Sequence, residues 1–164
     1  MAEKIINVQT PRGLTRLLYR APIWFYRLGL GGLMGENNVL LNHIGRRSGK
    51  TRQAVVEIIR HDKGANVYIV ASGLGEKSDW FQNLMVHPDI TIQVGRKRMA
   101  AHAERLPLPQ ATEILLDYSH RNARGIRAFA SMIGYRIVDY KEGVRFLIRV
   151  IRVVSLATTD LQEK

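Results

Sequence analysis

Cysteine is absent from the 164-residue sequence, which excludes a disulfide framework and any thiolate metal site. No apolar run is long enough to cross a bilayer, and the first residues lack the charged-then-apolar pattern of a signal peptide. Acidic residues are also scarce: 14 Asp and Glu stand against 25 Lys and Arg, for a net charge of +11. These features predict a cytoplasmic protein whose surface attracts polyanions, such as nucleic acid, anionic lipid or a phosphorylated small molecule.

Familiar catalytic and nucleotide-binding motifs are missing too. The five histidines are far apart in the sequence and lack the spacing of metal ligands, so we expect no metal site. The segment GRRSGKT has three residues between Gly45 and Gly49, where a P-loop needs four, and a β-branched segment follows it instead of a helix. The segment GLGGLMG has Met34 where a dinucleotide-binding motif needs its third glycine, and we interpret it as a flexible loop.

Hydrophobic periodicity predicts an α+β protein with a strand-rich middle. Leu14–Leu28 has helical spacing, and Pro22 within it predicts a new start or a kink. Further helices are predicted at Ser78–His87, Leu108–Tyr118 and Arg121–Gly134. Strands are predicted at Val39–Ile44, Ala54–His61, Val67–Ser72, Ile90–Val94, Met99–Arg105 and Arg149–Leu156. Because the strands follow one another through short turns, we expect an antiparallel sheet or barrel.

The length of the chain predicts a single domain over residues 1–164. Its expected parts are an N-terminal helix and loop (1–38), a barrel core (39–106), and helices with a final strand (107–164). The densest positive charge falls in the core, in the stretch GRRSGKTRQ, which has four cationic side chains, two glycines and a serine. The residues alone leave three interpretations open: a phosphate site, a nucleic-acid contact, or a solvated turn between two strands.

Two segments, Leu40–Arg52 and Ala71–Leu106, together resemble the deazaflavin-dependent nitroreductase family. The matching positions are Gly45, Arg46, Ser48, Gly49, Arg52, Ala71, Ser72, Gly75, Trp80, Asn83, Leu84 and Pro88. The motifs occur in the family's order with compatible spacing. The resemblance implies a split antiparallel β-barrel of the FMN-binding type with flanking helices.

The resemblance also implies an enzyme with a deazaflavin cofactor, coenzyme F-420, that transfers a hydride to a small quinone, enone or nitro compound. The cofactor tail carries a phosphodiester and glutamates, and forked guanidinium groups and glycine N–H groups suit such a polyanion. The implied cofactor-binding residues are Gly45, Arg46, Arg47, Ser48, Gly49, Lys50, Arg52, Ala71, Ser72, Lys77, Trp80 and Asn83.

Departures from the family leave the catalytic residues unknown. The tyrosine-rich stretch that lines the substrate pocket in relatives is not reproduced, so Tyr118 and Tyr135 are proton-donor candidates by residue type alone. An FMN- or haem-binding protein on the same barrel is the first alternative, because a basic phosphate site also suits FMN.

Binding through charge alone is the less favoured alternative. No nucleic-acid-binding motif is recognisable, so we expect no nucleic-acid partner. The basic amphipathic segment Leu14–Leu28 could contact a membrane surface, although we expect it to cover the barrel instead. We expect a monomer or a homodimer.

Overall fold

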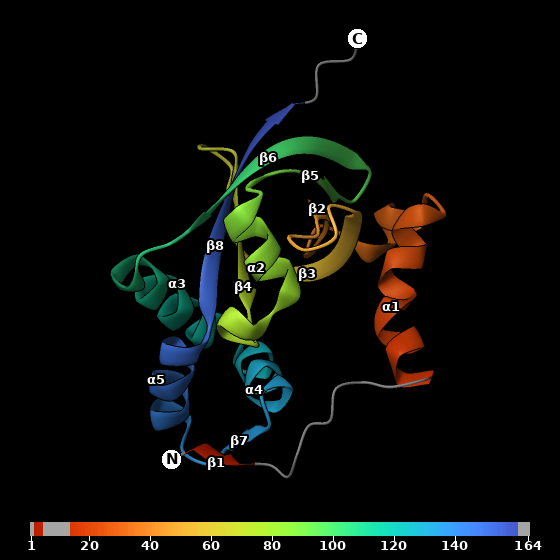
Figure 1. The fold of residues 1–164 in the computed structure, drawn as a ribbon. Coiled ribbons are helices and arrows are strands. Elements are labelled where there is room, and N and C mark those ends of the chain that lie inside the picture. Colours follow the sequence, from red (N-terminus) through yellow and green to blue (C-terminus); the bar gives the residue numbers. More distant parts are fainter. Residues whose placement is uncertain (1, 5–13, 161–164) are drawn as a thin grey trace.

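A closed antiparallel barrel of six strands forms the centre of the molecule (Figure 1). The computed structural model describes residues 2–4 and 14–160. The barrel strands are β2 (Asn38–Ile44), β3 (Thr51–Asp62), β4 (Val67–Ser72), β5 (Asp89–Val94), β6 (Lys97–Arg105) and β8 (Arg152–Asp160). Their order around the barrel is β2–β3–β4–β8–β6–β5, and β5 pairs with β2 to close it. Consecutive barrel strands pair except β4 and β5, because β8 lies between β4 and β6.

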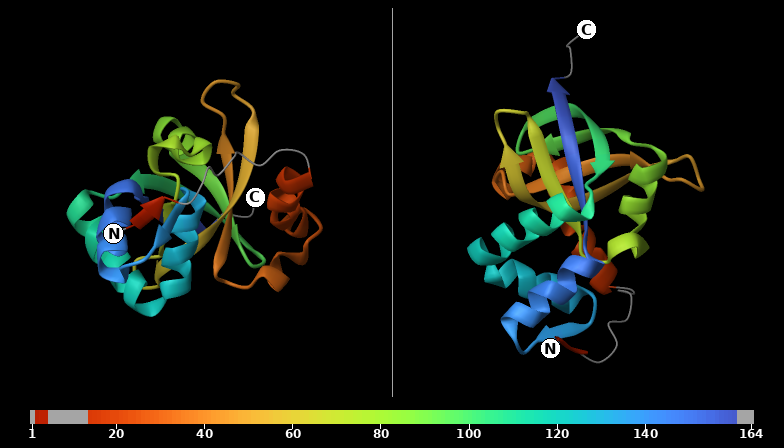
Figure 2. Two further views of the ribbon diagram at one scale, coloured as in Figure 1. Left: turned by 90° about the horizontal axis from the view of Figure 1, so that it is seen from below. Right: turned by 90° about the vertical axis from the view of Figure 1, so that its left-hand side faces the viewer.

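Helices cover this barrel on several sides. The elements are α1 (Leu14–Arg27), η1 (Leu30–Met34), η2 (Gly75–Lys77), α2 (Asp79–Val86), α3 (Leu108–Arg121), α4 (Ala123–Met132) and α5 (Tyr140–Val150). In Figure 1, α3, α4 and α5 gather below the barrel, α2 lies across its front, and α1 stands at the right. A short antiparallel pair, β1 (Ala2–Lys4) with β7 (Tyr135–Ile137), lies beyond the helices (Figure 2).

Two hydrophobic clusters explain this arrangement. Inside the barrel, β5 buries alternate residues, Ile90, Ile92 and Val94, as a half-exposed strand should. β4 is instead buried along almost its whole length, because its outer face packs under α3, α4 and α5. Its sequence VYIVAS is accordingly a continuous apolar run, which is typical of a strand covered on both faces.

The main departure from the predicted elements is α5, which the sequence prediction missed. The expected strand Arg149–Leu156 is wrong at its start, because Arg149 belongs to α5 and β8 begins at Arg152. A sequence signal for the helix was present: the Asp139 carboxylate accepts a hydrogen bond from the Glu142 N–H, at 2.9 Å, and so caps the first turn.

Two predictions about the N-terminal segment are also corrected. Pro22 lies inside one continuous helix, so the predicted new start there is wrong. The segment GLGGLMG forms η1 rather than a free loop, since Gly31 is buried against the β5–β6 turn, where an added Cβ would lie 2.5 Å from the Gly95 carbonyl oxygen.

The helix α1 contacts the barrel through few residues. The Tyr26 hydroxyl donates to the Asn38 carbonyl at 3.1 Å, and Arg27 Nε donates to Gln53 Oε1 at 2.9 Å. Trp24 and Phe25 stay exposed, so the membrane-surface alternative is left untested. Across residues 2–4 and 14–160, we find no helix with both the length and the hydropathy needed to cross a membrane.

Candidate functional site

The β2–β3 turn, residues Gly45 to Lys50, projects from the barrel in both views of Figure 2. The Gly45 N–H donates to the Lys50 carbonyl at 2.9 Å, and the Gly49 N–H donates to the Gly45 carbonyl at 2.8 Å. Gly49 has a φ of +66°, which a side chain would disfavour. Ser48 Oγ accepts from the Lys50 N–H at 3.3 Å. These groups therefore hold the shape of the turn and present its cationic side chains.

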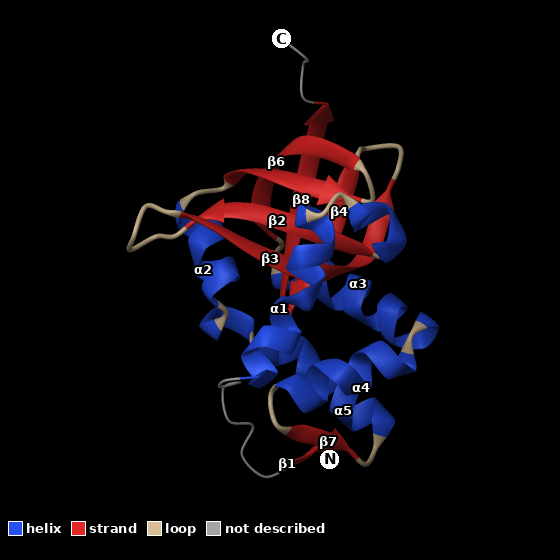
Figure 3. Ribbon diagram, turned by 90° about the vertical axis from the view of Figure 1, so that its right-hand side faces the viewer, coloured by secondary structure: helices blue, strands red, loops and turns tan. Residues whose placement is uncertain are grey.

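A buried amide ties this turn to α2, which lies beside it in Figure 3. Asn83 Oδ1 accepts from the Arg46 backbone N–H and from Arg46 Nη1, both at 3.0 Å. Arg46 Nη1 also contacts Asp79 Oδ1 at 3.1 Å. Asn83 is only 4% exposed, so its amide stays shielded from water. Arg46 is thereby held in place by two residues of α2, Asp79 and Asn83, and these contacts attach the turn to that helix.

The contacts of Arg46 with Asn83 and Asp79 anchor the turn to α2, and His43, on β2, adds a further contact to this anchor. Asn83 Nδ2 donates to His43 Nδ1 at 3.1 Å, which puts the ring proton of the neutral histidine on Nε2. Burial lowers the pKa of His43 below 6.5, and the nearby Arg52 lowers it further, whereas Asp79 opposes the shift. The neutral ring is therefore the form that accepts the hydrogen bond from Asn83.

This burial predicts an acid-sensitive contribution to stability. Because the folded pKa of His43 is lowered, the unfolded chain takes up this proton first as pH falls. Stability from His43 should be complete above about pH 6.5 and be lost as pH falls toward the folded pKa. Thermal unfolding across pH of the wild type and His43→Gln measures this difference. If both proteins lose stability in parallel below pH 6.5, His43 is not held neutral.

The remaining cations of the turn are exposed. Arg47, Lys50 and Arg52 have no ion-pair partner among residues 2–4 and 14–160, whereas Arg46 pairs with Asp79. Arg52 lies directly opposite His43 in the β2–β3 register, so its side chain leaves the sheet on the face that carries the anchor. The turn and the first residues of β3 thus present three exposed cations without ion-pair partners among the described residues, an arrangement that suits an anion with several negative groups.

The other predicted cofactor-binding residues, in the segment Ala71–Leu106, lie on both sides of η2 and within it. The Ser72 hydroxyl is buried and donates to the Gly75 carbonyl at 2.8 Å, so it closes the turn after β4. Ala71 packs into the cluster under the helices, and Trp80 packs half-buried against the barrel cluster. Lys77 is exposed just before α2. The structure thus brings Asn83 to the basic turn, while Ala71 and Ser72 serve packing and turn geometry.

The two tyrosine candidates lie elsewhere. Tyr118 is 2% exposed, and its hydroxyl donates to Glu57 Oε1 at 2.7 Å. Burial and then Glu57 raise the pKa of Tyr118 strongly, so it holds its proton firmly. Tyr135 lies on β7, with its ring centroid 4.7 Å from that of Phe146. Both tyrosines pack in the helical cluster, so a proton-donor role has no support from their positions.

Sequence reasoning missed two residues of the anchor, His43 and Asp79. His43 lies in an apolar strand, where a single histidine is normally interpreted as a residue of the core. The only available signal was its place next to the basic stretch. For Asp79, the sequence showed only that it lies near the start of a predicted helix, whereas in the structure its carboxylate pairs with Arg46.

Comparison with known proteins places this chain among reductases. The profile of the family described as F420H(2)-dependent quinone reductase matches residues 18–137. A Mycobacterium tuberculosis protein, Rv3178, provisionally named an F420H(2)-dependent quinone reductase, is 40% identical over 79 residues. This match covers 47% of the chain and 65% of the relative, so the chain spans less than two thirds of that relative's length.

Solved structures share the barrel. A chain described as a domain-swapped dimer matches with a TM-score of 0.53 at 17% identity, over 88% of this chain and 99% of its own. A Clostridium acetobutylicum protein related to general stress protein 26, of the pyridoxinephosphate oxidase family, matches at 0.50 and 10% identity, over 82% and 84%. An F420-H2 dependent reductase, FDR-A, matches at 0.48 and 18% identity, over 74% and 95%. The first two likenesses concern the fold alone, and the predicted split barrel with flanking helices is confirmed.

Proposed function

The chain belongs to the F420H(2)-dependent quinone reductase family, and from this premise we propose that it is a deazaflavin-dependent oxidoreductase. Its proposed cofactor is coenzyme F-420, and its proposed acceptor is a small quinone-like compound. The observation that carries the proposal is the anchored basic turn, on which Arg47, Lys50 and Arg52 are exposed without ion-pair partners among the described residues.

The exposed cations around the turn suit the anionic tail of coenzyme F-420. A phosphodiester followed by glutamates needs several cations along an open surface, and the turn offers two guanidiniums and an ammonium on one rigid support. Lys77 lies at the end of η2, just before α2, and supplies a further exposed cation. When bound, the reduced deazaflavin supplies the hydride for a two-electron reduction of the acceptor.

The protein's own contribution is binding and orientation. Arg52 and Arg47 would hold the anionic tail, while Asn83 and Arg46 keep the turn against α2. Trp80, half-buried on the same helix, would offer an apolar surface to the ring system. We assign no proton donor, and solvent can supply the proton that the acceptor needs. Holding donor and acceptor together lowers the entropic part of the barrier.

Cofactor choice tests this proposal against the FMN alternative. We expect the purified protein to bind F-420 more tightly than FMN in fluorescence quenching titrations, because the turn has more cations than one phosphate requires. F-420 binding should weaken as salt rises, since screening shortens to about 3 Å at 1 M. A deazaflavin without its glutamates should bind less tightly and respond less to salt. Equal or tighter FMN binding would contradict the proposal and favour the flavin-binding alternative.

The finer features of this function are part of the same proposal. The quinone acceptor comes from the family description, and nitro compounds and enones stay alternative acceptors. A homodimer is proposed alongside a monomer, because a matching solved structure is described as a domain-swapped dimer. A cytoplasmic location stays a prediction from composition.

A further inference from the structure

A basic cavity, separate from the β2–β3 turn, lies between the end of β6, the first turn of α3 and the junction of α5 with β8. Its volume is about 400 Å³. Three arginines, Arg105, Arg149 and Arg152, line it together with six apolar residues. This combination of an apolar lining and a few charged groups is typical of small-molecule pockets. None of these residues belongs to the basic turn or to α2.

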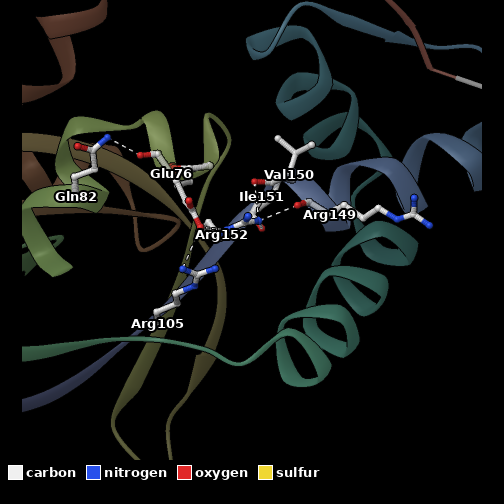
Figure 4. Close-up of polar contacts among 9 residues, drawn as sticks. Glu76, Gln82, Arg105, Arg149, Val150, Ile151 and Arg152 are labelled. Atoms are coloured by element: carbon white, nitrogen blue, oxygen red, sulfur yellow. Dashed lines mark hydrogen bonds and ion pairs between the residues drawn. The ribbon is translucent and has the colours of Figure 1, made fainter.

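Two of the three arginines of this cavity share a single carboxylate. Arg105 Nη1 and Arg152 Nε both contact Glu76 Oε1, at 3.1 Å and 3.0 Å (Figure 4). The guanidinium of Arg149 extends away from Glu76 in Figure 4, and its nitrogen atoms have no hydrogen-bond partner among the described residues. Two positive charges therefore remain uncompensated around the cavity.

On one wall of the cavity, the Arg152 side chain is held in position by hydrogen bonds to the backbone. Arg152 Nη1 donates to the carbonyl groups of Arg149 and Val150, at 2.8 Å and 3.2 Å, which closes the end of α5. The side chain of Arg152 is 24% exposed, so these bonds are partly shielded from water. Ile151 beside it is buried and forms an apolar floor. An anion would meet a guanidinium that is already held in position.

The opposite side of the cavity offers an apolar contact. Leu108, at the start of α3, is 61% exposed although it lines the cavity beside the arginines. The first turn of α3 has no side-chain cap, so its positive dipole end is also left facing this side. A ligand with both a negative group and a short hydrocarbon part would cover Leu108 and neutralise the arginines together.

We propose that this cavity binds a small organic anion, consisting of one carboxylate or phosphate group on a short apolar body. Arg105 and Arg152, whose guanidiniums converge on one carboxylate oxygen, contact the anionic group, and Leu108 contacts the apolar body. The Glu76 carboxylate competes with the ligand for Arg105 and Arg152. The cavity does not depend on the deazaflavin, so the proposal stands apart from the proposed function.

Octanoate is the probe that tests it, titrated into the cofactor-free protein by calorimetry. Inorganic phosphate tests the anionic group alone, and octanol tests the apolar body alone. We expect octanoate to bind more tightly than either. If octanol or phosphate binds as tightly as octanoate, the cavity does not recognise the combination, and the proposal is overturned.

Variants locate the binding in the cavity. Arg105→Gln should weaken octanoate binding roughly tenfold or more, by loss of a charge-assisted contact. Glu76→Gln should tighten it, because the competing carboxylate is gone. Arg145→Gln is the matched control, since Arg145 is also an arginine that pairs with a single glutamate, Glu142, but it lies outside the cavity. Unchanged octanoate affinity in both Arg105→Gln and Glu76→Gln would overturn the proposal.

Discussion

Replacing Asn83 with leucine should destabilise the protein by about 2–5 kcal/mol and weaken F-420 binding at least tenfold. The Asn83 amide is 4% exposed and bonds to the Arg46 backbone, the Arg46 guanidinium and the His43 ring. Leucine fills a similar volume but leaves the Arg46 N–H and His43 Nδ1 without partners, at about 1–3 kcal/mol each. Chemical denaturation measures the first effect, and fluorescence quenching by F-420 measures the second.

Two comparison variants separate anchoring from general damage. Asn83→Asp keeps acceptors for Arg46 but removes the donor to His43, so it should destabilise less and should raise the pKa of His43 by adding a negative charge. Asn122→Leu removes another structural asparagine, whose Oδ1 accepts from the Gly125 N–H at 2.9 Å at the start of α4. It should lower stability yet leave F-420 affinity unchanged. If Asn83→Leu lowers stability without lowering affinity, the anchor does not position the turn.

The barrel could be predicted because its signals are local. Ile90, Ile92 and Val94 alternate with half-exposed residues along β5, and the pleat of a strand turns that alternation into one buried face. The helix α5 was not predicted because its buried residues, Val144, Leu147 and Ile148, lie in a stretch whose β-branched residues also suit a strand. Its helical period was present, but β-branched composition favoured the wrong element.

The candidate site was also predictable in part: its local features could be predicted, and its long-range contacts could not. The cations of the turn could be predicted from their density and from the family resemblance. The contact between Arg46 and Asn83 could not, because 37 residues separate the two and only the closed barrel brings α2 to the turn. The resemblance marked Asn83 as a cofactor neighbour, whereas the structure shows its amide oxygen and nitrogen bonded to Arg46 and His43.

Removing the guanidinium of Arg52 is expected to lower F-420 affinity roughly ten- to a hundredfold, while the fold stays intact. Arg52 is exposed at the start of β3, and no described residue forms an ion pair with it. A charge-assisted hydrogen bond contributes about 1.5–3 kcal/mol, and each 1.4 kcal/mol is about a factor of ten. Arg52→Lys should recover only part of the affinity, because an ammonium keeps the charge but loses the fork.

A second readout identifies where Arg52 acts. Arg52 lowers the pKa of His43, so Arg52→Ala should raise that pKa, which NMR titration of the histidine ring measures without any cofactor. Arg124→Ala is the matched control, since Arg124 is an exposed arginine on α4, and it should change neither the His43 pKa nor the F-420 affinity. An Arg52→Ala protein that melts early but binds F-420 normally would make Arg52 a structural residue. The tail would then have to bind elsewhere on the basic surface.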